Sequence, residues 1–167
     1  MTRLALAGAS NFRDFGGQTT RSGAHVKTGM LFRSDKLSAL TADDHATLEP
    51  LKFQRIFDLR RESESKNAPT VWPGPTILEL PLFRDESGPT TFDRLLNDPA
   101  ARKNPETARA GMRDLYQKLV HAPSAQDGYK SIFSYLAEPE HFPVVVHCSA
   151  GKDRTGVVCA LILGALG

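Results

Sequence analysis

The chain has 167 residues and a mass of 18.3 kDa, the size of one ordinary domain. Apolar residues make up 40%, enough for a packed core, and a charged fraction of 24% with a net charge of +2 excludes wholesale disorder. A pI near 8.6 is too mild to predict an obligate nucleic-acid binder. Two cysteines, Cys148 and Cys159, cannot form a disulfide framework.

No apolar run approaches the ~20 residues that a membrane-spanning helix needs. The first ten residues contain one arginine and few apolar side chains, which predicts that no secretion signal is cleaved. We therefore expect a reduced cytoplasmic protein with no transmembrane segment, and secretion without a cleaved signal is also compatible with these features.

The predicted elements alternate between strand and helix along the chain. Between two of the strands, residues 62–75 carry charges, three prolines and one glycine, which predict an exposed loop. This alternation predicts an α/β layer fold with a mainly parallel sheet. Strands are predicted at residues 30–33, 55–59, 76–82 and 143–147, and helices at residues 41–48, 107–120, around 132–136 and from about 154 to 166.

Two of the predicted helices carry strong apolar patterns. Met112 and Tyr116 fall on the apolar face of the helix at 107–120 and are predicted to be core residues. Apolar side chains surround nearly the whole circumference of the last helix, which predicts that it is buried. Because a chain end supplies little covering protein, we expect residues 1–167 to form a single domain that lacks C-terminal helices.

The most informative segment reads VVVHCSAGKDRTG, from Val144 to Gly156. An apolar strand leads to Cys148, and a short loop of small residues then leads to Arg154 at the start of a helix. Ligand sites in open α/β sheets lie beyond the carboxyl ends of the strands. The N–H groups of such a loop can surround one anion, and the helix N-terminus points at it. Because Arg154 is six positions after Cys148, a closed loop returns the guanidinium to the sulfur, where it can bind two phosphate oxygens.

A helix N-terminus and a nearby cation favour the thiolate of a cysteine, which is its nucleophilic form. The alternative is a buried, inert Cys148 after a core strand, which is common for free cysteines. The glycines and the arginine that follow at these spacings argue against that alternative. A nucleotide-binding loop is a second alternative, but the pattern G-x-x-x-x-G-K-[ST] fails at Val146 and at Asp153.

Cys148-x5-Arg154-Thr155 resembles the signature loop of cysteine-based tyrosine and dual-specificity phosphatases. Together with NFRDFGG at 11–17, LFRS at 31–34 and DLR at 58–60, it is similar to the bacterial tyrosine phosphatase family. The resemblance implies a three-layer fold with a mainly parallel sheet flanked by helices. It also implies hydrolysis of phosphate monoesters in proteins, on tyrosine, serine or threonine, and in phosphoinositides. One departure is that such relatives continue for several more helices.

Chemistry and resemblance together imply roles in the loop. Cys148 is expected to attack phosphorus and become a phosphocysteine, while Arg154 and the loop N–H groups hold the equatorial oxygens. Thr155 can donate its hydroxyl to the sulfur. His147 either organises the loop through a hydrogen bond or is a satisfied core histidine. The predicted substrate-binding residues are Ser149, Ala150, Gly151, Lys152, Asp153, Arg154 and Thr155.

The general acid has three candidates, because it must protonate the leaving oxygen and then activate water. Asp153 is the first, because it sits in the loop beside the arginine. Asp58 is the second, at the end of a neighbouring predicted strand, where it would equally serve as a hydrogen-bonded carboxylate that braces the loop. Asp85 is the third.

The remaining motif residues are expected to support the fold or to select the substrate. Asn11, Arg13 and Asp14 are expected to brace the fold. Lys152 either meets a second phosphate of an inositol lipid, or points to solvent or pairs with Asp58.

The expected partners are phosphorylated proteins or phosphoinositides, with no nucleic acid, no metal and no other cofactor, because no ligand cluster has metal-binding spacing. The sequence leaves the oligomeric state open. The alternative functions are an inactive phosphate-binding module and another thiol enzyme that cradles an anion.

Overall fold

The computed structural model describes residues 2–84, 97–99 and 103–167. Five strands form one sheet in the order β1-β2-β5-β3-β4, in which β1 is antiparallel and the other four are parallel. The strands are β1 (Arg13–Asp14), β2 (Leu31–Ser34), β3 (Arg55–Asp58), β4 (Thr76–Glu79) and β5 (Val144–His147). The helices are α1 (Ala42–Leu48), α2 (Glu62–Asn67), α5 (Pro105–His121), α6 (Pro123–Leu136) and α7 (Asp153–Leu166), with 3-10 turns η1 (Glu49–Leu51) and η3 (Pro139–His141).

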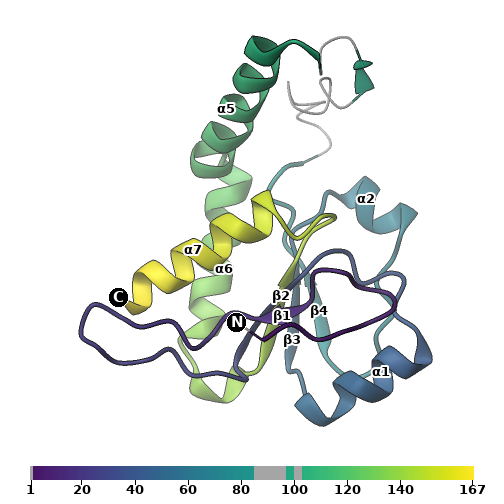
Figure 1. The fold of residues 1–167 in the computed structure, drawn as a ribbon, viewed down its shortest axis with the longest axis vertical. Coiled ribbons are helices and arrows are strands. Elements are labelled where there is room, and N and C mark those ends of the chain that lie inside the picture. The colour runs from purple at the N-terminus through teal and green to yellow at the C-terminus, as the bar shows by residue number, and fades with distance from the viewer. Residues whose placement is uncertain (1, 85–96, 100–102) are drawn as a thin grey trace.

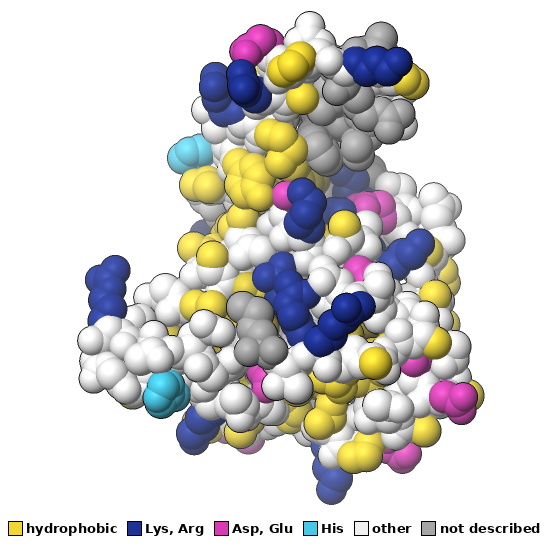
Figure 2. All heavy atoms as spheres, viewed as in Figure 1, with side chains coloured by type: hydrophobic (Ala, Val, Ile, Leu, Met, Phe, Trp, Pro, Cys, Tyr) yellow, Lys and Arg dark blue, Asp and Glu magenta, His cyan; other side chains and the backbone are white. Residues whose placement is uncertain are grey.

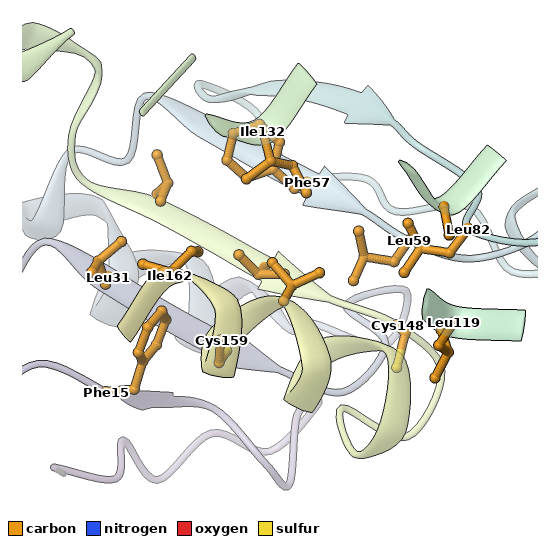
Figure 3. Packing of buried hydrophobic residues seen from close by; sticks show 14 of the residues in the cluster. Phe15, Leu31, Phe57, Leu59, Leu82, Leu119, Ile132, Cys148, Cys159 and Ile162 are labelled. Carbon is orange, nitrogen blue, oxygen red and sulfur yellow. The ribbon is translucent and has the colours of Figure 1, made fainter. Parts of the chain in front are cut away.

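Two hydrophobic clusters cover the two faces of the sheet, as Figure 1 shows for the helices. On one face, α5, α6 and α7 contribute Leu119, Ile132 and Ile162 to a core that Figure 3 shows from close by. On the other face, the N-terminal segment and α1 contribute Phe12 and Leu48. This three-layer α/β arrangement confirms the predicted fold class.

β5 is the central strand, and all four of its residues are buried. Val144 and Val146 belong to the cluster beneath α5 to α7, whereas Val145 belongs to the cluster on the opposite face. Because successive side chains of a strand point to opposite faces, a continuous β-branched run suits a strand that is covered on both sides. The prediction of a strand ending at His147 is therefore confirmed.

The parallel strands end at one edge of the sheet. In register, Ser34 and Asp58 lie on either side of His147, and Glu79 follows beside Asp58. The segment that contains Cys148 therefore leaves the middle of this edge, between the ends of β2 and β3. Ligands bind at this edge in open α/β sheets.

Residues 62–75 differ from the prediction of an exposed loop. Their first six residues form α2, in which Glu64 Oε2 accepts a hydrogen bond from the Arg61 backbone N–H at 2.8 Å, and Ser65 is buried. The prediction was wrong for this part because a six-residue polar helix shows no apolar periodicity. The capping contact between positions 61 and 64, rather than a hydrophobic face, defines where it begins.

The last helix differs from prediction as well. Val158, Cys159 and Ile162 of α7 are buried, but Leu161 and Leu166 are 41% and 50% exposed. The expected burial of the whole circumference was therefore wrong, because α7 packs against the sheet on one side only. That further helices follow residue 167 stays a prediction. Within the described ranges, no helix has both the length and the apolarity to cross a membrane.

Candidate active site

The segment of residues 148–152, here called the Cys148 loop, is held from outside by the N-terminal motif. Asn11 Nδ2 donates hydrogen bonds to the backbone oxygens of Ala150 and Gly151 at 3.1 and 3.2 Å. Arg13 in turn donates to the backbone oxygen of Asn11 at 3.0 Å and to its side-chain oxygen. These contacts support the predicted bracing role of Asn11 and Arg13.

Arg33 of β2 and Lys36, two residues after the end of that strand, complete this outer brace. Arg33 Nη2 donates to Gly151 O at 2.7 Å, and the Lys36 backbone N–H donates to Ser149 O at 3.2 Å. In a trans peptide, the C=O of one residue and the N–H of the next point in opposite directions. Because the carbonyls of the loop point outward to these donors, the N–H groups that follow them point inward. Such a ring of inward N–H groups can bind an anion.

Gly151 allows the loop to lie directly on the end of β2. Its φ is +64°, a conformation that residues with a side chain rarely adopt. A Cβ at this position would lie 2.6 Å from the Asp35 backbone nitrogen and closer still to the Ser34 oxygen. Only glycine therefore permits this approach without displacing β2.

Two aspartates hold the N-terminal motif in place. Asp14 accepts hydrogen bonds from the backbone N–H groups of Gly16 and Gly29 at 2.7 and 2.6 Å, so it braces the fold at a distance from the loop. Asp35 accepts from the Asn11 N–H at 3.0 Å and from Ser10. Sequence reasoning missed Asp35, which fixes the backbone of the residue that bonds to the loop.

Arg154, in the first turn of α7, makes a bidentate ion pair with Glu64 of α2. Nη1 lies 2.5 Å from Oε2, and Nη2 lies 2.9 Å from Oε1, which also accepts from the Ser149 hydroxyl. Burial alone would raise the pKa of Glu64, but the hydrogen bonds and charge of Arg154 lower this pKa to about 2. Glu64 therefore stays ionised and orients the guanidinium. Sequence reasoning missed it.

Cys148 lies at the base of the loop and is 2% exposed. Burial lowers the pKa of Arg154, but the hydrogen bond to Glu64 and the charge of Cys148 outweigh it and keep this pKa above its usual value. A permanent cation thus lies beside the sulfur. The buried Thr155 hydroxyl makes no hydrogen bond to any described residue, so its predicted bond to the Cys148 sulfur stays a prediction for a later step.

His147 is fully buried, and its Nε2 lies 3.5 Å from Asp58 Oδ2. Burial lowers the pKa of His147 to about 4, so the ring is neutral at neutral pH. Neither ring nitrogen meets the geometry of a hydrogen bond within the described part of the chain, although the Cys148 backbone is near enough to oppose the lowering of the pKa of His147. The loop-organising role of His147 stays a prediction.

Asp58 is enclosed rather than open to a ligand. Its carboxylate accepts from Arg60 Nε at 2.9 Å and from Nη2 at 2.6 Å, and its side chain is 2% exposed. Burial alone would raise the pKa of Asp58, but the hydrogen bonds of Arg60 hold it below its usual value. An ionised, enclosed carboxylate is poorly suited to donate a proton. This geometry favours the bracing role over the acid role.

Asp153 lies in the first turn of α7 beside Arg154, and its side chain is 15% exposed, against 2% for Asp58. Its Oδ1 accepts hydrogen bonds from the Tyr116 hydroxyl at 2.9 Å and from Lys152 Nζ at 3.0 Å. Lys152 thus pairs with Asp153 rather than with Asp58, and its side chain is 68% exposed.

The predicted core position of Tyr116 was wrong. Tyr116 is 42% exposed, because Leu115 and Leu119 supply the buried face of α5. The third acid candidate, Asp85, lies outside the described residues.

One face of the molecule carries a cluster of basic side chains. Lys and Arg side chains lie close together near the middle of the face shown in Figure 2, and a positive surface attracts negatively charged ligands. Within residues 2–84, 97–99 and 103–167, no group of three or more His, Cys, Asp or Glu side chains is arranged to hold a metal. The N–H ring, the guanidinium and the thiol together can bind a tetrahedral oxyanion and attack its central atom.

Comparison with known proteins agrees with this geometry. The model of the tyrosine phosphatase family matches residues 4–167. The chain belongs to the tyrosine phosphatase family. It is 35% identical over 180 aligned positions to the triple specificity protein phosphatase PtpB of Mycobacterium tuberculosis, covering 97% of this chain. It is 40% identical over 140 positions to a tyrosine-protein phosphatase of Nostoc commune, covering 81% of this chain.

These relatives are longer than the chain. The aligned part spans 63% of PtpB and 42% of the Nostoc commune protein. The segments that carry the site, from Asn11 to Thr155, nevertheless all lie inside the region that the family model matches.

Proposed function

We propose that the chain is a cysteine-dependent phosphatase that hydrolyses phosphate monoesters through a phosphocysteine. One observation carries this proposal: a single loop brings together the Cys148 thiol, a ring of inward N–H groups and the Arg154 guanidinium. Thiolate and phosphate repel each other, so both charges must be neutralised within one loop, and these groups can do so.

In the first step, the Cys148 thiolate attacks phosphorus and forms an S–P bond while the bond from phosphorus to the ester oxygen breaks. Asp153 gives its proton to the departing oxygen, which leaves as an alcohol or a phenol. The loop N–H groups and Arg154 hold the three equatorial oxygens, where charge accumulates in the transition state.

In the second step, water attacks phosphorus and the S–P bond breaks. The Asp153 carboxylate takes a proton from that water, inorganic phosphate leaves and the Cys148 thiolate is restored. The buried Thr155 hydroxyl can donate to the sulfur as it departs.

The proposed substrates are phosphorylated proteins and, as a second candidate, phosphoinositides. The name of PtpB describes a triple specificity protein phosphatase, which supports the first class. Lys152 favours the second, because it is the last residue of the loop, its side chain is 68% exposed, and it can meet an additional phosphate.

The test compares serine variants of the two cysteines, with a chromogenic aryl phosphate as the substrate. Cys148→Ser should abolish turnover while vanadate binding persists, because the N–H ring and Arg154 remain. Cys159→Ser is the matched control and should keep nearly full activity, because burial in α7 raises the pKa of the Cys159 thiol to about 11 and keeps it protonated.

Mass spectrometry of rapidly quenched wild-type protein should detect phosphate on Cys148. Turnover by Cys148→Ser would overturn the covalent mechanism. A wild-type chain that binds vanadate without turning over any aryl phosphate would instead be a phosphate-binding module.

A further inference from the structure

Tyr116 connects α5 to the beginning of α7. Its hydroxyl donates to Asp153 Oδ1 across 37 positions of sequence, at 2.9 Å. The helix that carries it is fixed by Leu115 and Leu119, which are 5% and 0% exposed in the core. The tyrosine has only two rotatable side-chain bonds, so its hydroxyl is held in place more firmly than a flexible lysine holds its amine.

Both hydrogen bonds to the Asp153 carboxyl end on the same oxygen. Tyr116 and Lys152 donate to Oδ1, and Oδ2 has no hydrogen-bond partner among the described residues. A carboxyl group anchored through one oxygen presents the other in a fixed direction. Donors on the anchored oxygen also stabilise the negative charge that develops when the proton leaves the other.

We propose that Tyr116 is a positioning residue for the general acid: it holds Asp153 Oδ1 so that the proton on Oδ2 faces the leaving oxygen. The inference rests on the proposed phosphatase function and on Asp153 as its acid. Burial and the charge of Asp153 raise the pKa of Tyr116, so the phenol remains a donor throughout the pH range in which the acid works.

The test uses the dependence of the rate on the leaving group. A departing phenolate of low basicity needs no proton, whereas a basic one does. Tyr116→Phe keeps the ring and removes only the hydroxyl. We expect its kcat/KM to fall about tenfold for phenyl phosphate and less than twofold for 2,4-dinitrophenyl phosphate. The tenfold loss is smaller than the roughly 10²- to 10⁴-fold that a general acid supplies, because Asp153 itself remains.

Tyr129→Phe is the matched control. Tyr129 lies on α6, and its hydroxyl donates a hydrogen bond to Leu119 O of α5 at 2.6 Å rather than to Asp153. We expect this variant to change thermal stability without changing the ratio of the two rates. A leaving-group effect of equal size in Tyr129→Phe would overturn the proposal.

A second measurement combines Tyr116→Phe with Asp153→Asn. If the Tyr116 hydroxyl acts through Asp153, Tyr116→Phe should cause almost no further loss of rate in the Asp153→Asn background, because the effects of two coupled residues do not add. An equal loss for both substrates, or the same loss in both backgrounds, would overturn the positioning role while leaving the phosphatase intact. A wild-type chain that hydrolyses neither substrate would overturn the proposed function and this inference together.

Discussion

Two arginine–carboxylate pairs flank the Cys148 loop, and they differ in how much of each arginine is left for other partners. Arg60 and Asp58 are two positions apart and only 1% and 2% exposed. Arg154 and Glu64 are 90 positions apart and 15% and 31% exposed. Both pairs have short contacts, at 2.6 and 2.5 Å, so distance alone does not separate their roles.

The Arg60 guanidinium is enclosed, and each of its three nitrogens donates to a protein oxygen. Besides Asp58, it donates to Ala68 O at 2.8 Å and to the Thr70 hydroxyl at 3.2 Å, which ties the chain after α2 to the end of β3. Arg154 is oriented by its bidentate pair with Glu64, and its further contacts, to Leu59 O at 3.5 Å and to the Ser149 hydroxyl at 3.4 Å, are longer than those of Arg60. It is also more exposed than Arg60 and lies beside the Cys148 sulfur. Breaking a closed pair leaves a buried charge without its counterion, whereas a partly exposed pair can direct its cation at a ligand.

The largest effect is expected at the partly exposed pair. Arg154→Lys keeps the charge but loses the planar fork, so kcat should fall about 10³-fold, as when a preorganised donor to the transition state is removed. Steady-state kinetics with an aryl phosphate measures the loss. Arg109→Lys, in an exposed surface pair on α5, is the control and should retain full activity. A near-normal rate in Arg154→Lys would mean that the guanidinium does not bind the phosphate.

Breaking the closed pair should act on stability instead. Asp58→Asn leaves the Arg60 charge buried without a counterion, so the free energy of unfolding should fall by about 3 kcal/mol or more. Urea denaturation measures it, with Asp127→Asn as an exposed control. Activity per folded molecule should drop less than tenfold. A loss of activity as large as that of Arg154→Lys, with unchanged stability, would make Asp58 the acid.

Glu64→Gln should show an intermediate effect. The amide keeps the shape but no longer holds the guanidinium by charge, so kcat should fall about 10- to 100-fold through misplacement of Arg154. Glu62→Gln on the same helix is the control, because Glu62 is exposed. Because the pKa of Glu64 is about 2, its charge is constant from pH 5 to 8. Titration of Glu64 should therefore not appear in the dependence of the wild-type rate on pH. Equal rates for Glu64→Gln and wild type would show that α2 does not orient the arginine.

The smallest effect is expected at the exposed ion pair. Lys152→Ala removes a side chain that is 68% exposed, and such charges contribute under about 1 kcal/mol, or roughly fivefold. We expect a two- to fivefold loss on a bisphosphorylated inositol lipid and less on a phosphotyrosine peptide. Lys130→Ala, 77% exposed on α6, is the control. Equal losses on both substrates would remove the support for lipid recognition.

The sequence predicts the centre of the site well because its chemistry is local. The apolar run before His147, the small loop residues and Arg154 all lie within one short segment, so a single pattern defines a strand, a loop and a helix start. The bracing role expected of Asn11 is harder to locate, because its contact with the loop spans 139 positions, yet the polar NFRD motif indicated it.

The partners of the site were harder to predict because they come from distant, weakly patterned segments. Glu64 lies in a charged six-residue helix that has no hydrophobic face, and only its spacing from Arg61 gives a signal. Tyr116 shares a helical face with apolar residues, so periodicity assigned it to the core, although it stands at the margin of that face and reaches Asp153. Side-chain direction at such a margin depends on packing, which periodicity does not describe.

The contact of Gly151 with the end of β2 divides the loop into fixed and adjustable positions. Gly151 is fixed by the backbone that it touches, whereas its neighbours Ala150 and Lys152 are both exposed to solvent. An engineer who wishes to change which phosphate ester the protein prefers therefore has two sites, one on either side of Gly151, that can be randomised without disturbing the ring of donors. Libraries at positions 150 and 152 should yield folded proteins with altered selectivity, whereas libraries at position 151 should yield mostly unstable ones.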